Sequence, residues 1–118
     1  MDKLEEMFQM QRALDADIET NRALHFTTEE WMQKEVLAML SELAEVLDEV
    51  NFKWWKNPKP LDDDKLKNEV VDVAHFLLSM CLRSGMSADE LYARYVAKNQ
   101  ENFDRQHGRS VKHGYEVE

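Results

Sequence analysis

Two stretches of sequence decide the fold: SELAEVLDEV at residues 41–50 and NEVVDVAHFLLSM at residues 68–80. Apolar residues recur in both at helical spacing, and two carboxylates stand three residues apart in each, Glu42 with Glu45 and Glu69 with Asp72. A carboxylate inside an apolar helix is costly unless something compensates its charge. If the two helices form an antiparallel hairpin, Glu45 and Glu69 each lie about five residues from the turn, at similar heights. The four acids would then converge, and we predict a metal site.

Carboxylate oxygens are the ligands that Mg²⁺ prefers, and divalent metal held by acids is typical of phosphate chemistry. Mn²⁺ could substitute. Glu49, one helical turn beyond Glu45, could be a fifth ligand. The alternative is that Glu42, Glu45 and Glu49 form a solvated stripe on an exposed helix. Glu69 and Asp72 fit that alternative less well, because valines surround them.

The rest of the chain predicts an all-α fold, a four-helix bundle with helices at about 3–20, 28–50, 64–84 and 88–106. Thr27 with Glu30 and Ser87 with Glu90 have the spacing of capping boxes. In the last helix we expect four apolar residues to face inward: Leu91, Tyr95, Val96 and Phe103. We expect a single domain over residues 1–107 and a mobile tail over residues 108–118, which contains Gly108 and Gly114.

The composition excludes several classes of function. The chain has 118 residues and a net charge of −9, which argues against nucleic acid and anionic membranes as partners. A single cysteine, Cys81, excludes an internal disulfide, and its apolar surroundings favour a small buried side chain over a catalytic thiol. The chain begins without an apolar signal core and contains no apolar run of about 20 residues, so we expect a cytoplasmic protein.

The irregular stretch after residue 50 contains candidate substrate-binding residues: Lys53, Trp54, Trp55 and Lys56. The aromatic faces could stack on a base, and the lysines could neutralise phosphate. The alternative is that a tryptophan fills the core or a subunit interface.

Polar residues at other positions could also contact a ligand. Lys98, Asn102 and Arg105 recur at helical spacing and could bind phosphate and sugar, although an ordinary solvated face has the same spacing. Gln11 is polar on an apolar helix face and could recognise a base. His75, one turn after Asp72, could contact ligand or be a satisfied core histidine.

Together these segments resemble the all-α nucleoside triphosphate pyrophosphohydrolases, the superfamily that includes MazG. Their hallmark is Glu-x-x-Glu, a spacer, then Glu-x-x-Asp. More narrowly, the chain resembles a short form of the dimeric, all-helical dUTPases in four further segments: MFQMQRALD at residues 7–15, FKWWKNPKP at 52–60, EVVDVAHFLLS at 69–79 and KNQENFDRQ at 98–106.

The resemblance implies hydrolysis of dUTP to dUMP and diphosphate. Glu42, Glu45, Glu69 and Asp72 would hold Mg²⁺ with Glu49 assisting, and an acid of the first pair would draw the proton from the attacking water. The resemblance implies that phosphate charge is balanced by Lys53, Lys56, Lys98 and Arg105. It implies that the nucleoside is held by Gln11, Trp54 or Trp55, and Asn102.

One departure from the resemblance concerns the base. The dUTPase pattern has Asn where this chain has Asp15, so a housecleaning enzyme acting on dCTP or modified nucleotides stays open. A non-catalytic helical module that dimerises or senses nucleotide is a further alternative. Apolar faces left over by four helices, including Trp31, predict a homodimer or a tetramer.

Overall fold

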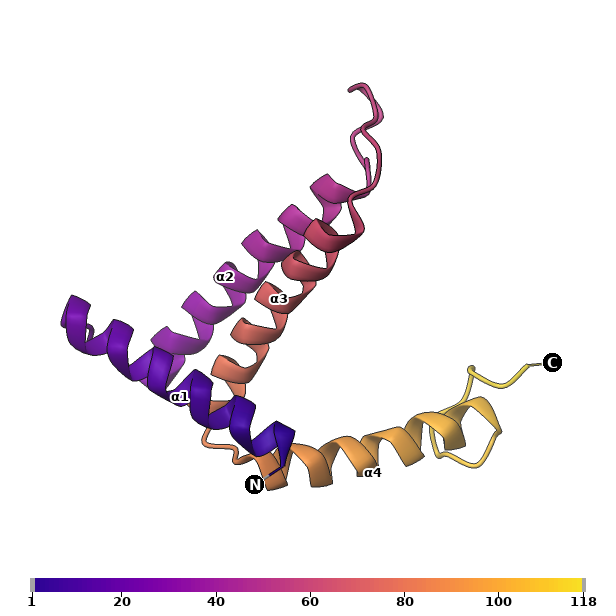
Figure 1. The fold of residues 1–118 in the computed structure, drawn as a ribbon. Helices are drawn as coiled ribbons and strands as arrows, with labels where there is room; N and C mark the ends of the chain where they lie inside the picture. The colour runs from indigo at the N-terminus through magenta and orange to yellow at the C-terminus, as the bar shows by residue number, and fades with distance from the viewer. Residues whose placement is uncertain (1, 118) are drawn as a thin grey trace. The chain divides into compact units, whose positions relative to one another are not determined.

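Four α-helices make up the secondary structure of the computed structural model, which describes residues 2–117 (Figure 1). They are α1 (Lys3–Arg22), α2 (Thr28–Glu49), α3 (Asp63–Arg83) and α4 (Ala88–Gln106). The described residues contain no strand. The predicted all-α fold with four helices is therefore confirmed, and the boundaries differ from the expected ones by two residues at most.

The caps at the helix starts follow the sequence signals with one exception. The Thr27 hydroxyl accepts from the Glu30 backbone N–H at 3.1 Å, and the Thr27 N–H donates to the Glu30 carboxylate at 3.1 Å. This is the predicted capping box. Before α4, Ser87 accepts from the Glu90 N–H, but the Glu90 carboxylate instead accepts from Arg94 at 3.0 Å. The second predicted capping box is therefore only half formed.

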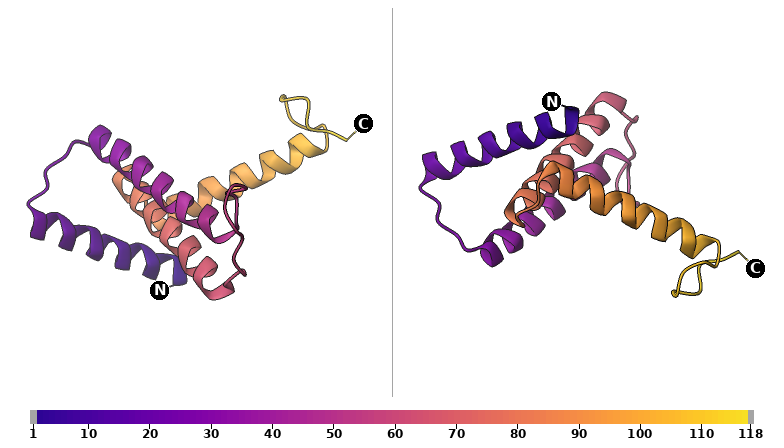
Figure 2. Two further views of the ribbon diagram at one scale, coloured as in Figure 1. Left: turned by 90° about the horizontal axis from the view of Figure 1, so that it is seen from above. Right: turned by 90° about the horizontal axis from the view of Figure 1, so that it is seen from below.

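Helices α2 and α3 form an antiparallel hairpin and lie side by side along most of their length (Figures 1 and 2). The connecting residues 50–62 include Pro58 and Pro60, which disfavour helix in this segment. Asp62 caps the start of α3 by accepting from the Lys65 N–H at 3.1 Å. This hairpin fixes the relative height of every acid on its two helices.

The apolar core of residues 2–85 is small. Phe8 of α1 and Leu78 and Cys81 of α3 are its buried apolar side chains. Cys81 is 3% exposed, and burial raises the pKa of its thiol, as expected of a packed side chain rather than a nucleophile. Helix α1 is joined to α3 through polar contacts as well, which contribute to the site described below.

The chain divides into two units, Met1–Gly85 and Met86–Glu118. The single domain expected over residues 1–107 stays a prediction. In the second unit the tail folds back on the end of α4: Ser110 donates to Glu101, and Arg109 donates to Asp104 at 3.1 Å. The mobility expected for residues 108–118 stays a prediction.

Most of the expected inward face of α4 is not covered within the second unit, although Leu91 is half-buried. Tyr95, Val96 and Phe103 are exposed, with Tyr95 at 70%. Their apolar spacing correctly indicates a helix with one apolar face. However, residues 86–117 do not cover this face by themselves, and the spacing alone cannot tell what it packs against.

Candidate metal and nucleotide site

Four carboxylates converge between α2 and α3. Glu42, Glu45, Glu69 and Asp72 each offer one oxygen that lies within 4.8 Å of the others. Residues three apart share a helix face, and the antiparallel hairpin brings the two acidic edges to one level. The structure therefore produces the convergence that the spacing of the two motifs predicts.

Burial divides the cluster into two kinds of acid. Glu42 and Glu69 are half-buried, whereas Glu45 and Asp72 are exposed. The Oε2 atoms of Glu42 and Glu69 are buried and have no hydrogen-bond partner among the described residues. A buried, unpartnered carboxylate oxygen costs free energy, so each of these atoms calls for a cation or a proton.

The pKa values of both half-buried acids respond to this crowding. Burial raises the pKa of Glu42 above its ordinary value of 4.5, and the neighbouring Glu45 and Asp72 add to the shift. The pKa of Glu69 is also raised, first by a hydrogen bond shared with the Glu45 carboxyl group and then by burial and by repulsion from the other acids. The cluster repels itself unless a positive charge joins it.

The donor set fits Mg²⁺. Four carboxylates supply hard oxygen ligands, and their exposed side leaves room for water and phosphate oxygens, which Mg²⁺ usually retains. The two unpartnered oxygens are the observation on which this fit rests. Mn²⁺ accepts the same ligands.

Glu49 lies outside the group of four. It is 3% exposed, and its Oε1 lies 3.3 Å from Lys59 Nζ and 3.2 Å from Lys65 Nζ. Burial alone would raise its pKa, but hydrogen bonds from Lys65 and Lys59 outweigh burial and lower the pKa below 4.5. Its expected metal contact stays a prediction, and two ammonium groups already compensate its charge.

The loop between α2 and α3 carries the predicted lysines and tryptophans into solvent. Trp54 is 87% exposed and Trp55 is 63% exposed, and their rings meet edge to face at 4.6 Å. Lys53 pairs with Asp48 at 3.4 Å. Lys53 and Lys56 both line a pocket of about 360 Å³ at this end of the hairpin. Neither tryptophan fills a core in the single chain.

Gln11 and His75 meet in a polar network between α1 and α3. The Gln11 Oε1 atom lies 2.6 Å from His75 Nδ1, and its Nε2 donates to Asp15 at 2.9 Å. Asp15 also accepts from Ser79 at 2.8 Å. Gln11 is 5% exposed, so its amide is occupied by protein partners and orients Asp15 and His75.

The sequence reasoning missed the inner part of this network. Ser79 Oγ lies 2.8 Å from Glu35 as well as from Asp15, and Arg83 approaches Glu35 at 3.5 Å and Glu19 at 2.9 Å. Glu35 is buried, and its Oε2 has no partner among residues 2–117. One signal was available: Glu35 interrupts an apolar helical face, as Glu69 does.

The predicted residues on α4 belong to the second unit. Lys98 and Asn102 line a pocket of about 430 Å³ on this helix. Arg105 donates to Glu101 at 3.0 Å, and its guanidinium group lies 5.6 Å from the centre of the Tyr115 ring. Their contact with substrate stays a prediction.

Residues 3–88 match the family model described as dUTPase. An all-α fold carrying this acidic motif defines a class of nucleotide pyrophosphohydrolases. The chain belongs to the all-α dimeric dUTPase family, within the MazG-like superfamily of such enzymes.

Two similar proteins are named dCTP pyrophosphatase. That of Enterobacteria phage T4 is 33% identical over 87 residues, covering 62% of this chain and 51% of that protein. That of Enterobacteria phage LZ5 is 34% identical over 74 residues, covering 63% of this chain and 43% of that protein. A protein of phage T4 named DNA replication protein is 31% identical over 80 residues, covering 56% of this chain and 20% of that protein. The chain thus spans about half the length, or less, of these relatives. No solved structure matches it.

Every helix in the described part of the chain is too short or too polar to cross a lipid bilayer.

Proposed function

We infer that the protein is a Mg²⁺-dependent nucleoside triphosphate pyrophosphohydrolase, which converts a deoxynucleoside triphosphate and water to the monophosphate and diphosphate. The observation that carries this proposal is the convergence of four carboxylates, two of which leave a buried oxygen without a partner. Net charge −9 would otherwise repel a triphosphate, so metal ions are needed to bring the two together.

Glu42, Glu45, Glu69 and Asp72 would hold the metal. When bound, Mg²⁺ supplies positive charge that neutralises phosphate oxygens and activates water. In hydrolysis the water oxygen forms a bond to one phosphorus, and the bridging P–O bond breaks with its electron pair on the departing oxygen. An acid of the first pair, Glu42 or Glu45, would accept the proton of the water.

The first candidate substrate is dUTP, which the family description names. The exposed ring of Trp54 or Trp55 would stack on the nucleoside, and Lys53 and Lys56 would balance phosphate charge. Lys98, Asn102 and Arg105 would contribute phosphate and sugar contacts from α4.

A second candidate substrate is dCTP, and Asp15 favours it. Cytosine presents an exocyclic amine, a donor, where uracil presents a carbonyl oxygen, an acceptor. Gln11 donates to one oxygen of Asp15, and Ser79 has only one hydroxyl proton for the other Asp15 oxygen and for Glu35, so one of these two acceptors lacks the Ser79 proton. An amine would satisfy this network, whereas a carbonyl would be repelled. A base bound here lies near the end of α3, away from the loop, so stacking on Trp54 or Trp55 belongs to the first candidate only. The names of the two phage relatives are consistent with this choice.

A Glu69→Gln variant tests the proposed activity. The change removes one ligand charge while keeping the shape, so diphosphate release from dUTP and dCTP should fall at least about a hundredfold. Asp64→Asn, an exposed acid in the first turn of the same helix, is the matched control and should retain turnover. Full turnover by Glu69→Gln would contradict the assignment.

The rival hypothesis is a non-catalytic module that senses nucleotide. It predicts no metal-dependent turnover of any triphosphate, together with binding of Mg²⁺ and a nonhydrolysable triphosphate analogue. Calorimetry with the analogue and a diphosphate-release assay on all canonical deoxynucleoside triphosphates separate the two hypotheses.

The exposed apolar residues support a homodimer as the minimal assembly, with a tetramer as a larger form. On α2 they follow helical spacing at Val36, Leu37, Leu40, Leu43 and Leu47, and Leu37 is 66% exposed. Helix α1 carries a similar row at Met7, Met10, Leu14 and Ile18. Apolar rows of this length in a soluble protein normally contact another surface.

A further inference from the structure

Lysines line the pocket at the loop end of the α2–α3 hairpin. Its volume is about 360 Å³, and four of its lining residues are lysines: Lys53, Lys56, Lys59 and Lys65. Lys53 pairs with Asp48, Lys59 and Lys65 pair with Glu49, and Asp62 and Glu69 also act on Lys65. The pocket therefore gathers four ammonium groups in a chain whose net charge is −9.

Glu49 holds two of these lysines in place. Its carboxylate is buried, and both Lys59 Nζ and Lys65 Nζ lie within 3.3 Å of its Oε1. The hydrogen bond to Glu49 raises the pKa of Lys65, and Glu69 adds to the shift. An ammonium group has three N–H donors, and Glu49 takes one from each lysine. The side chains are 49% and 55% exposed, so the other donors can reach a ligand.

The loop itself is built to present Lys59. Asn51 has a positive φ of 57°, and its side chain brackets the backbone of Lys59. It donates to the Lys59 carbonyl at 2.8 Å and accepts from the Lys59 N–H at 2.9 Å. These two bonds close the loop at its base, so Lys59 is positioned before any ligand arrives.

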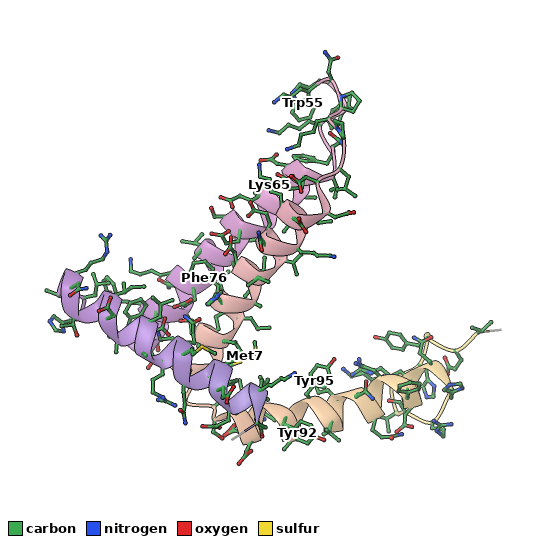
Figure 3. The ribbon with its side chains drawn as sticks, in the orientation of Figure 1. Met7, Trp55, Lys65, Phe76, Tyr92 and Tyr95 are labelled. Atoms are coloured by element: carbon green, nitrogen blue, oxygen red, sulfur yellow. The ribbon has the colours of Figure 1, made fainter. Side chains whose placement is uncertain are left out.

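The lysine pair lies one helical turn from the metal-binding carboxylates. Glu49 follows Glu45 by four residues on α2, and Lys65 precedes Glu69 by four residues on α3. Four residues correspond to about 6 Å along a helix axis. Figure 3 shows Lys65 at the start of α3, below the loop that carries Trp55. A phosphate chain held at the carboxylates by metal could extend to both ammonium groups.

We propose that Lys59 and Lys65 form a diphosphate-binding site, in which Glu49 is a positioning residue rather than a metal ligand. The site takes the two terminal phosphates of the substrate and then the diphosphate product. This use of the site rests on the proposed function. The affinity of the pocket for diphosphate does not depend on the proposed function, because it follows from the lysines that line the pocket.

Calorimetric titration of the full chain with inorganic diphosphate, with and without Mg²⁺, tests the site. Each of Lys59→Met and Lys65→Met should weaken diphosphate binding about tenfold, as expected for loss of one charge-assisted contact. Lys67→Met, an exposed lysine of the same helix outside the pocket, should change the affinity less than about twofold. Unchanged affinity in both pocket variants would overturn the proposal.

The role of Glu49 has its own readout. Glu49→Gln should weaken diphosphate binding while Mg²⁺ affinity stays within about twofold of wild type, because the group of four is intact. A fall in Mg²⁺ affinity to the level of Glu69→Gln would show that Glu49 is a ligand. If Glu49→Gln does not fold, Asn51→Gly releases Lys59 without altering any carboxylate and is expected to have the same two effects.

The outcomes also separate this site from the proposed function. If the wild-type protein binds diphosphate through these lysines but hydrolyses no triphosphate, the diphosphate site is supported and the proposed function is contradicted. If the protein hydrolyses a triphosphate but its affinity for diphosphate does not depend on Lys59 and Lys65, the proposed function is supported and the diphosphate site is contradicted.

Discussion

At the scale of single residues, the molecule places its acids in unequal surroundings. Glu42 and Glu69 are half-buried beside other carboxylates, and their pKa values are raised. Glu49 is more buried, yet its pKa is lowered, because two lysines compensate for burial. Glu42 and Glu69 therefore lack a positively charged partner and can bind a cation. Glu49, one helical turn away, is already paired with two lysines.

The raised pKa values predict that Mg²⁺ binding releases protons. When the pKa of an acid is higher in the folded state than in the unfolded state, protonation of that acid stabilises the fold. This stabilisation is complete at pH values below the ordinary pKa of 4.5, and it is lost as the pH rises through the raised pKa. Mg²⁺ needs the deprotonated form, so its affinity should fall as the pH is lowered toward that ordinary value. Calorimetry at pH about 5.5 in two buffers of different ionisation enthalpy measures the protons released. An enthalpy that is independent of the buffer would contradict the prediction.

Asp15→Asn tests which base the network around Gln11 selects. Asn keeps the shape and adds an N–H donor, which suits the carbonyl of uracil better than the amine of cytosine. The ratio of kcat/KM for dCTP to that for dUTP should fall about tenfold or more. Asp17→Asn, two residues further on α1 and bonded to Asn21, is the control and should leave the ratio unchanged. An unchanged ratio in Asp15→Asn would remove Asp15 from base selection.

At the scale of the elements, the hairpin of α2 and α3 was predictable and its loop was not. Helical periodicity and the Thr27 cap are local signals that can be read from the sequence. Because α2 and α3 are antiparallel and their acids lie equally far from the turn, the four carboxylates have to meet at one level. The contact between Lys59 and Glu49 depends instead on the positive φ of Asn51 and on a closed loop, which no periodic pattern encodes. Asp15 was noticed from the sequence, but its partner Ser79 is 64 residues away in the chain and could not be paired with it.

Asn51→Gly tests how much the two hydrogen bonds that close the loop contribute to stability. Gly tolerates the same positive φ, so the change removes the two side-chain hydrogen bonds without straining the backbone. The free energy of unfolding, measured with urea, should fall by about 1–2 kcal/mol. Asn57→Gly, in the same loop, should have a smaller effect. Equal stability of Asn51→Gly and wild type would mean that water replaces both bonds at no cost.

At the scale of the whole molecule, each of the two units leaves apolar side chains that it does not cover itself. The apolar rows on α1 and α2 are exposed, and so is the apolar face of α4 around Tyr95. A chain of 118 residues can bury only part of its apolar surface alone. The helix spacing indicates an apolar face on each of these helices, but periodicity cannot distinguish a core from a subunit interface, and the inward face predicted for α4 is exposed in its own unit.

The exposed rows predict a dimer in solution. Light scattering at micromolar concentration should give twice the chain mass of 14.0 kDa, and Leu40→Lys should shift the protein toward monomer. Val111→Lys alters a residue of the tail that is 94% exposed and should not change the mass. A wild-type mass of 14.0 kDa would contradict the proposed interface.

The three tryptophans differ in their exposure to solvent, so the intrinsic fluorescence of the chain can report on ligand binding. Trp31 lies against the Arg83 guanidinium group at 3.6 Å, whereas Trp54 and Trp55 are 87% and 63% exposed on the loop. Indoles in water emit at longer wavelength and are quenched by dissolved iodide, while a covered indole is shielded. Arrival of a nucleotide at the loop would therefore change the intrinsic fluorescence and its quenching without any attached dye.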